Sequence, residues 1–323
     1  MKQEIFEIVG RMPQYIELRG LKKTNKLTHA YMLIGSDGLL LEGFARLFAK
    51  LVLCGNGIPC DKCVSCQKND LGVHPDLCVL PKEEKYAVSA VEWLNANSNL
   101  VPLEAGKKVY ILDRFDSASP AVQNKLLKLL ENPPPSVTFI VCVSSERAVL
   151  PTIHSRCKRI RLNSLKESDI KNYLTKTVPE AKDIGKIAKL CGGNLQRAID
   201  FVSVGYMQNY NLVLDTLVNL KGSGTMLLQA GRLNEKKEQI ETLLEIFETV
   251  LREVLLLRLN KKELMLEDDP RISEIAGEIT APMVDLIIRR LYLLKRQLSL
   301  NCSTVGVIDN LLLYILEVKH TCS

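Results

Sequence analysis

Apolar and polar positions follow two alternating patterns in the first half of the chain. Between short apolar runs, apolar residues recur at the spacing of an amphipathic helix, most clearly along Leu39–Leu53. Four short and mostly apolar runs predict buried strands: Tyr31–Ile34, Leu77–Leu80, Val109–Leu112 and Thr138–Val143. Because strands alternate with helices, the pattern predicts an α/β domain with a parallel, doubly wound sheet. Ligands of such sheets bind at the carboxyl ends of the strands.

Polar residues at helix ends indicate where two further helices begin and end. Ser89–Glu92 has the form of a capping box, which predicts that a helix carrying Trp93 begins there. Ser119, followed by proline, predicts the start of a helix that runs through Glu131. Asn132–Pro135 then ends that helix, because the prolines cannot continue it.

The strand pattern ends near Leu162, and the rest of the chain has helical spacing. We expect three parts: an α/β domain over residues 1–162, a small helical domain over 163–208 and a longer helical domain over 209–323. Gly192 and Gly193 predict a helix break in the middle part. Leu243–Leu259 and Met283–Leu300 are long amphipathic stretches in the last part.

The composition fits a water-soluble protein with several packed cores. Of the 323 residues, 46% are hydrophobic and 25% charged, and the net charge of +6 permits an acidic partner without requiring one. No apolar run reaches about 18 residues, so we expect no membrane span. The N-terminal residues lack the apolar core of a secretory signal. We therefore expect a cytoplasmic protein.

The segment after the first predicted strand has the place of a phosphate-binding loop but lacks its key residues. Gly35 and Gly38 are present. A working loop needs a lysine for the β- and γ-phosphates and a serine or threonine for magnesium. Leu41 and Glu42 occupy those two places. The loop is therefore degenerate, and we expect it to bind no ATP.

Four cysteines within 13 residues predict a structural zinc site. Their spacing is C-x5-C-x2-C-x2-C, at Cys54, Cys60, Cys63 and Cys66. Four thiolates can complete a tetrahedral zinc site, which leaves no position for a catalytic water. The alternative is a set of free thiols in a mobile loop or an adventitious redox pair. The other six cysteines are scattered, which is typical of thiols in the core or on the surface.

Two basic clusters have alternative interpretations. Lys158, Arg159 and Arg161 form a short basic run that fits either a solvated edge, which we favour, or a contact to a partner or to DNA phosphates. Arg289 and Arg296 lie on the last amphipathic stretch, which fits a packed helix with a basic edge. Aromatic residues make up only 5% of the chain, so a stacking platform for single-stranded nucleic acid is not expected.

Several motifs, taken together in this order, resemble one family. The chain is similar to the delta-prime subunits of bacterial clamp loaders, which load the sliding clamp for DNA polymerase III. The motifs that carry the resemblance are His29-Ala30-Tyr31, the four-cysteine module, His74-Pro75-Asp76, the strand Lys108–Asp113, the helix end Asn124–Pro134, the stretch Leu150–Cys157 and the segment Gly192–Arg197.

The resemblance implies an AAA+-like P-loop NTPase fold with a zinc module over residues 54–66. It implies a lid domain over 163–208 and an all-α collar over 209–323 that holds subunits in a ring. In active relatives the acidic strand ends in Asp-Glu, whereas this chain has Asp113-Arg114. An arginine cannot activate a water, so hydrolysis lacks a base here as well as the loop lysine.

The resemblance further implies that the chain is a stator that supplies Arg156 in trans to a neighbouring ATP site. The alternative from the residues alone is that Arg156 pairs with a local carboxylate or is solvated. The implied partners are the ATPase subunits gamma/tau, the delta subunit, the sliding clamp indirectly, and primer–template DNA through the complex. The isolated chain would have no catalytic activity, although it would be part of the DNA polymerase III holoenzyme.

Two rival functions remain open from the sequence. One is an active AAA+ clamp-loader ATPase of the gamma/tau type, which would have to tolerate Leu41 and Glu42 in a phosphate site. The other is a zinc-containing nucleic-acid-binding protein with a vestigial ATPase fold. The second would bind DNA by itself, in a salt-sensitive manner.

Overall fold

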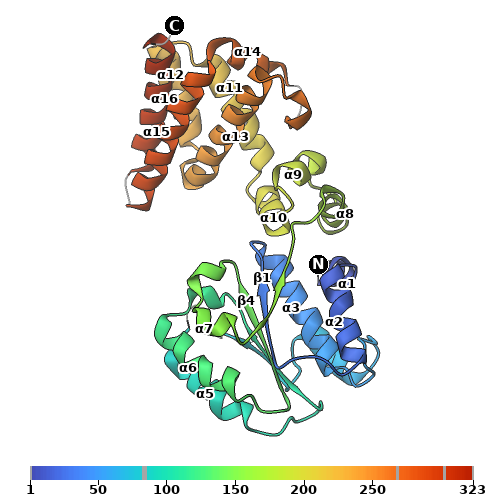
Figure 1. The fold of residues 1–323 in the computed structure, drawn as a ribbon. Helices are drawn as coiled ribbons and strands as arrows, with labels where there is room; N and C mark the ends of the chain where they lie inside the picture. The colour runs from blue at the N-terminus through green and yellow to red at the C-terminus, as the bar shows by residue number, and fades with distance from the viewer. Residues whose placement is uncertain (1, 82–85, 267–268, 301–302, 322–323) are drawn as a thin grey trace. The chain divides into compact units, whose positions relative to one another are not determined.

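A computed structural model describes residues 2–81, 86–266, 269–300 and 303–321 of the chain (Figure 1). The chain divides into two compact units. Unit 1 comprises Met1–Glu180 and Cys191–Arg197, and unit 2 comprises Ala181–Leu190 and Ala198–Ser323. The predicted division into three domains remains a prediction, and the two units are described separately below.

Unit 1 is built on a five-stranded, fully parallel sheet with strand order β2-β3-β4-β1-β5. The strands are β1 (Ala30–Ile34), β2 (Leu77–Leu80), β3 (Lys108–Leu112), β4 (Val137–Val143) and β5 (Lys158–Arg161). The central strands β1, β3 and β4 are buried along their whole length. The predicted parallel α/β sheet is thus confirmed, as are its four apolar strands.

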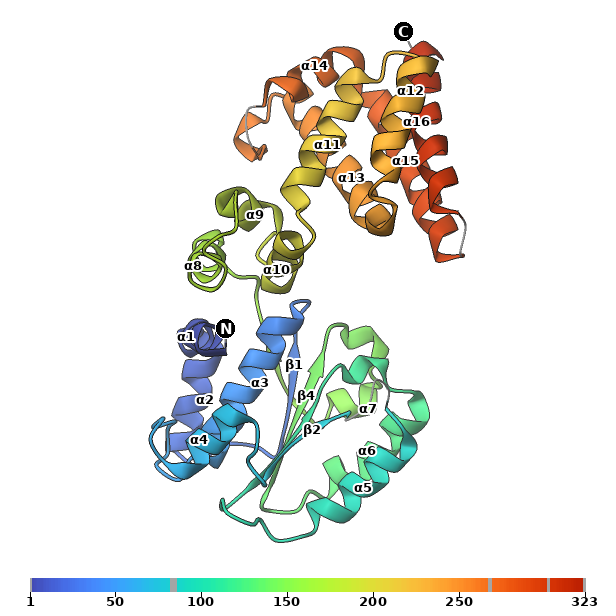
Figure 2. The same ribbon diagram turned by 180° about the vertical axis from the view of Figure 1, so that it is seen from behind.

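Helices cover both faces of this sheet (Figures 1 and 2). On one face lie α1 (Lys2–Gly10), α2 (Pro13–Lys23), α3 (Gly38–Leu53) and α4 (Val64–Leu71). On the other lie α5 (Val88–Ser98), α6 (Pro120–Glu131) and α7 (Pro151–His154). Unit 1 also contains α8 (Glu167–Thr177) and the short 3-10 turns η1 (Phe115–Ser117) and η2 (Glu146–Ala148). Helix α3 packs directly on β1, β3 and β4, so it lies over the centre of the sheet.

Helix α1 approaches α3 unusually closely at Gly43. A methyl group at this glycine would lie 2.2 Å from Cγ2 of Ile5, which is far inside van der Waals contact. Ile5 is itself only 5% exposed. The absence of a side chain at position 43 therefore allows α1 to pack against α3.

The predicted helix starts are confirmed in one case and wrong in the other. Ser119 accepts a hydrogen bond from the backbone N–H of Val122 at 3.4 Å and caps α6. By contrast, α5 begins at Val88 after Ala87, so the capping box at Ser89 does not exist. The hydroxyl of the preceding Tyr86 donates to two backbone carbonyls, and this anchor fixes the chain before it reaches Ser89.

The sequence pattern did not predict the fifth strand, β5. Of its four residues only Ile160 is buried, and the flanking side chains are basic. It pairs with β1 through the register of Tyr31 with Lys158, at the edge of the sheet. An edge strand has only one neighbour, and basic residues are common there because they discourage pairing with other chains.

Unit 2 is helical throughout its described residues. Its helices are α9 (Ile184–Leu190), α11 (Tyr206–Asn219), α12 (Ser223–Asn234), α13 (Ile240–Arg258), α14 (Pro270–Glu278), α15 (Ala281–Ser299) and α16 (Thr304–Thr321), with 3-10 turns η3 (Lys237–Gln239) and η4 (Lys262–Leu264). Helix α13 packs against α11, α14 and α15, and α16 packs against α12 and α15. The two long amphipathic stretches are confirmed as α13 and α15. None of the described helices is both long and apolar enough to span a membrane.

Helix α10 (Leu195–Ser203) follows the predicted break at the two glycines. Gly192 and Gly193 both have left-handed backbone angles, with φ of 60° and 84°. A methyl group at Gly193 would also lie 2.6 Å from the carbonyl oxygen of Leu165. Glycine is therefore required at this turn on two counts.

Candidate metal centre and degenerate nucleotide loop

The four cysteines predicted to bind zinc lie together in unit 1. The sulfur atoms of Cys54, Cys60, Cys63 and Cys66 all lie within 4.8 Å of one another. Sγ of Cys54 is 3.9 Å from that of Cys60 and 4.0 Å from that of Cys63. A tetrahedral zinc ion with bonds of about 2.3 Å separates its sulfurs by about 3.8 Å. The donor set and its spacing therefore fit a metal ion such as zinc.

The polypeptide supplies the four thiols from fixed positions. Cys54 follows the last residue of α3, and Cys63 caps the N-terminus of α4. Cys54 and Cys66 are fully buried. Two backbone N–H groups, of Lys62 and Cys63, lower the pKa of Cys60 to about 6. Burial raises the pKa of Cys66 to about 12, and a bound cation would favour its thiolate form.

His74 supports the cysteine module without joining its donor set. Its Nε2 lies 2.9 Å from the hydroxyl of Ser65 on α4, and its Nδ1 accepts the backbone N–H of Asp76 at 3.1 Å. Burial lowers the pKa of His74, which favours the neutral ring that these two bonds require. The prediction that four cysteines suffice is consistent with this geometry.

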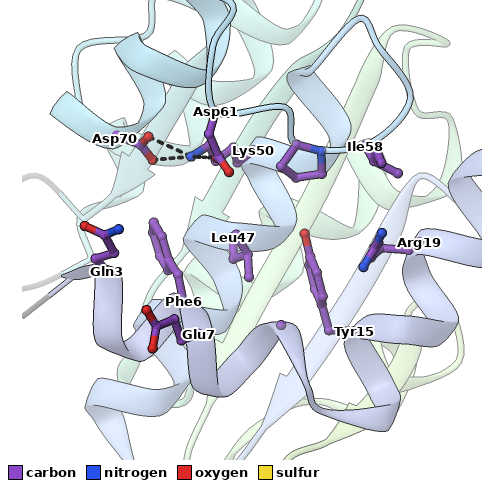
Figure 3. A pocket seen from close by; sticks show the side chains of 12 residues that line it. Gln3, Phe6, Glu7, Tyr15, Arg19, Leu47, Lys50, Ile58, Asp61 and Asp70 are labelled. Atoms are coloured by element: carbon purple, nitrogen blue, oxygen red, sulfur yellow. Dashed lines mark hydrogen bonds and ion pairs between the residues drawn. The ribbon is translucent and has the colours of Figure 1, made fainter. Parts of the chain in front are cut away.

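Lys50 of α3 ties together two segments of the module. Its ammonium group is 2.6 Å from Asp61, between the second and third cysteines, and 2.6 Å from Asp70, at the end of α4 (Figure 3). The Lys50 side chain is only 4% exposed. Burial alone lowers the pKa of Lys50, but the bonds to Asp61 and Asp70 outweigh it and raise the pKa. The lysine therefore stays charged and fixes both carboxylates against α3.

A cavity of about 600 Å³ lies beside this ion-pair cluster. Figure 3 shows Phe6 of α1, Tyr15 and Arg19 of α2, and Leu47 of α3 around it. The ammonium group of Lys50 also lies 5.8 Å from the centre of the Phe6 ring. Helices α1 and α2 thus pack on α3 near Lys50, beside the cysteine module. The sequence pattern had not predicted these two helices.

The degenerate loop lies at the other end of α3. The helix begins at Gly38, so only three residues, starting with Gly35, separate it from β1. Leu40 and Leu41, which stand at loop positions in the motif, are instead buried in the first turn, at 2% and 6% exposure. Glu42 is half exposed and pairs with Arg46 on the next turn. No wide loop remains that could wrap a phosphate chain.

The end of β3, which β4 separates from β1 in the sheet, carries a carboxylate paired with an arginine. Burial raises the pKa of the Asp113 carboxyl, the Arg114 guanidinium opposes the shift, and the Glu42 carboxylate adds to it. Arg114 reaches Asp113 at 3.4 Å and has a left-handed backbone with φ of 46°. Arg114 thus pairs with the adjacent carboxylate, and the strand end carries no second acidic residue to activate a water.

Arg156 lies just after α7 and is partly exposed. Its guanidinium is 2.6 Å from the carboxylate of Glu131 at the end of α6 and donates to the carbonyl of Thr152 at 2.8 Å. The side chain is 32% exposed. In the isolated chain the arginine is thus held in a local ion pair near the surface. Nothing in the geometry tests its predicted role toward a neighbouring subunit.

The basic run on β5 is paired with carboxylates of unit 1. Lys158 contacts Glu17 at 2.7 Å, while Arg159 and Arg161 reach Glu146 at 3.8 and 2.8 Å. The arginine bonds lower the pKa of Glu146. These contacts agree with the interpretation of the run as a partly solvated edge.

Sequence comparisons find similarity to subunits of DNA polymerase III. Residues 12–166 match the family model for "DNA polymerase III, delta subunit". The chain is 24% identical to subunit delta' of DNA polymerase III from Bacillus subtilis, covering 91% of this chain and 92% of that protein. It is 29% identical to subunit tau/gamma of Haemophilus influenzae over 66% of this chain, and 35% identical to subunit gamma of Buchnera aphidicola over 46%. The matched regions span only 33% and 42% of those two proteins.

Two solved structures align with most of the chain. One is a gamma subunit-related protein from Thermotoga maritima, with a TM-score of 0.47 and 16% identity, and the other is the clamp loader delta protein of B. subtilis, with 0.38 and 13%. Each alignment covers 94% of this chain and 99% of the other. By sequence, residues 12–166 thus match the model of the DNA polymerase III delta subunit family, and nearly the whole chain is similar to a delta' subunit.

Proposed function

We propose that this chain is a non-hydrolysing stator subunit of a bacterial clamp loader. The observation that carries the proposal is the state of the nucleotide loop. Its motif positions are filled by Leu40 and Leu41 of the packed core, and the Glu42 carboxylate helps to raise the pKa of Asp113 at the end of β3. With Asp37, Leu41 and Glu42 in place, the triphosphate of a nucleotide would meet both a steric block and like charge there. Such a subunit acts by placing a residue at a neighbour's ATP site and not by hydrolysing ATP itself.

The positional role falls to Arg156. An arginine offered to a neighbour's ATP neutralises charge that develops on the γ-phosphate, which is worth about 10³ to 10⁵ in rate. Partial exposure and an end-of-helix location support this role. To act in trans the guanidinium has to exchange Glu131 for a phosphate, and an ion pair this exposed costs only about 1 kcal/mol to break.

The remaining parts of the chain have supporting roles in this proposal. The cysteine module binds a structural zinc ion that stiffens the edge of the α/β domain. Residues 163–208 form the lid, and the helices of 209–323 form the collar that holds the chain in a ring with gamma/tau-type and delta subunits. The complex acts on the sliding clamp and primed DNA in the cytoplasm, and any contact of this chain with DNA is indirect or through phosphates, without base readout.

The decisive test is reconstitution with a gamma/tau-type ATPase and a delta subunit. We expect Arg156→Ala to leave assembly intact and to slow ATP hydrolysis at the adjoining site by about 10³-fold or more. Arg161→Ala, which removes another arginine paired to a carboxylate on this domain, is the matched control and leaves hydrolysis unchanged. Equal hydrolysis with wild-type chain and with Arg156→Ala would exclude the arginine role.

Titration of ATP with magnesium into the isolated chain separates the proposal from its rivals. We expect no binding up to millimolar nucleotide. Micromolar binding would instead favour an active ATPase of the gamma/tau type. Salt-sensitive binding of DNA by the isolated chain would favour the nucleic-acid-binding protein.

A further inference from the structure

The carboxylate of Asp37 receives backbone N–H groups from two different helices. Oδ1 accepts the N–H of Leu40, in the first turn of α3, at 3.0 Å. Oδ2 accepts the N–H of Leu195, the first residue of α10, at 2.5 Å. The N–H of Gln196 reaches Oδ1 at 3.4 Å. Asp37 is only 6% exposed, so these amides largely replace water around the carboxylate.

Both partners are helix N-termini, which carry partial positive charge. Helix α3 has 16 residues and α10 has 9, so each supplies an aligned row of peptide dipoles. Each N-terminus is equivalent to about half a positive charge and favours an anion. Two such ends that meet without an anion would repel each other and leave buried N–H groups unpaired. The single negative charge of Asp37 satisfies both.

Neighbouring contacts hold the start of α10 in place on this carboxylate. The side-chain amide of Asn194 donates to the carbonyl of Ser36 at 3.3 Å, and its oxygen accepts the N–H of Arg197 at 2.9 Å. The carbonyl of Gly193 accepts the N–H of Leu165 at 2.9 Å. The residues from 193 to 197 are therefore fixed to the β1–α3 loop and to the chain that follows β5.

Asp37 occupies the place where a nucleotide-binding loop would hold a phosphate. It follows β1 at the carboxyl edge of the parallel sheet and precedes the first helix, which is where such sheets bind anionic ligands. We propose that Asp37 is a built-in anion that takes the place of a nucleotide phosphate and joins the N-termini of α3 and α10 without any ligand. The proposal rests on the proposed function only for the origin of the loop, and it does not involve Arg156.

The test removes the carboxylate and offers an inorganic anion in its place. In full-length Asp37→Ala, amide hydrogen exchange at Leu40 and Leu195 is expected to accelerate about tenfold or more, because both N–H groups lose a buried acceptor. Millimolar pyrophosphate is expected to restore the protection and to raise the melting temperature of this variant. The same pyrophosphate is expected to leave the wild-type chain unchanged.

Asp37→Asn keeps the shape but lacks the charge, and it serves if the alanine variant fails to fold. It is expected to exchange faster than wild type at Leu195, because a neutral amide oxygen is a weaker acceptor than a carboxylate. Asp76→Ala is the matched control, since Asp76 also accepts three backbone N–H groups but at no helix N-terminus. It is expected to melt at a lower temperature while keeping protection at Leu195 and showing no response to pyrophosphate.

Two results would overturn the inference. One is unchanged exchange at Leu195 in both Asp37 variants, which would mean that the carboxylate joins nothing. The other is faster exchange at Leu195 in Asp37→Ala that pyrophosphate does not reverse. That result would make Asp37 an ordinary helix cap and not a substitute for a phosphate. Either result would leave the Arg156 reconstitution unaffected, so failure of this inference is distinguishable from failure of the proposed function.

Discussion

The two ends of helix α3 carry two ligand motifs with opposite outcomes. At its C-terminal end, Cys54 and the three other cysteines keep a donor set at the spacing of a metal ion. At its N-terminal end, the positions of the expected phosphate loop hold Leu40, Leu41 and the carboxylate of Asp37, beside which α3 begins. On our proposal, the difference is that one end of α3 keeps its ligand atoms whereas the other has protein groups in the place of a ligand. Absence of the motif alone would say less.

Removal of the metal should have the largest effect on stability. We expect Cys66→Ser to lose zinc and to lower the free energy of unfolding by about 3 kcal/mol or more. The reason is that the four thiols form a zinc site only in the folded chain, so zinc binding stabilises the folded state. Metal analysis and denaturant unfolding of anaerobically purified protein measure both quantities.

The matched control is Cys142→Ser, which alters an equally buried thiol on β4, far along the chain from the module. It should lose packing free energy but keep its zinc. Less than half an equivalent of zinc in the wild-type chain would contradict the metal assignment and remove the contrast between the two ends of α3.

Introducing the lysine and threonine of a working phosphate loop should not restore ATP binding. We expect the double variant Leu41→Lys and Glu42→Thr to bind no ATP and to lose about 2–4 kcal/mol of stability, because the lysine enters a buried position without a partner. Calorimetric titration of ATP and thermal unfolding test the two parts. Glu42→Thr alone is the control, and its exposed position predicts a change within about 0.5 kcal/mol. Micromolar ATP binding by the double variant would show that the loop is still open.

Lys50 should affect the metal end without affecting the nucleotide end. We expect Lys50→Met to weaken zinc binding by about tenfold, the lower range for residues that orient metal ligands, because Asp61 and Asp70 are released together. Competition with a chelator measures the affinity. Lys125→Met removes a surface ion pair with Glu92 and should leave zinc binding unchanged. Equal zinc affinity in both variants would show that the buried lysine is irrelevant to the module.

The smallest expected effect concerns pH at a carboxylate that serves neither ligand site. Burial by itself raises the pKa of Asp76, but backbone N–H groups of residues 103–105 lower it below its usual value near 3.8. Its stabilisation is therefore complete above that value and is lost as pH falls through the lower folded-state pKa. We expect Asp76→Asn to be less stable than wild type by about 1–2 kcal/mol at pH 7, with the difference shrinking below pH of about 3.8. Urea unfolding of both proteins between pH 7 and pH 3 gives the difference, and a constant difference would contradict it.

The sequence predicted features whose cause is local. Buried strands such as β4 are continuous apolar runs, and the helix break at Gly193 is a backbone requirement, so both were evident. The cysteine cluster was evident for the same reason, since its spacing within 13 residues limits the geometry. Leu41 and Glu42 predicted a degenerate loop, which stays a prediction, and the structure places both residues in the first two turns of α3.

The features that the sequence missed depend on contacts between distant segments. Strand β5 has one buried residue, Ile160, and owes its place to pairing with β1. The helix start at Val88 is set by Tyr86 bonding to backbone more than 20 residues away. The carboxylate of Asp37 meets a helix 158 positions further along. No window of sequence contains both partners of such contacts.

The close approach at Gly43 makes the packing of α1 on α3 sensitive to a single added methyl group. A methyl group there would lie 2.2 Å from Cγ2 of Ile5, so it would clash sterically with α1. Gly43→Ala would force Ile5 into another rotamer or push the helix outward, without touching the sheet or the cysteines. Helix α1 therefore depends on the missing side chain at position 43, and its displacement would expose Lys50 and the adjoining cavity to solvent.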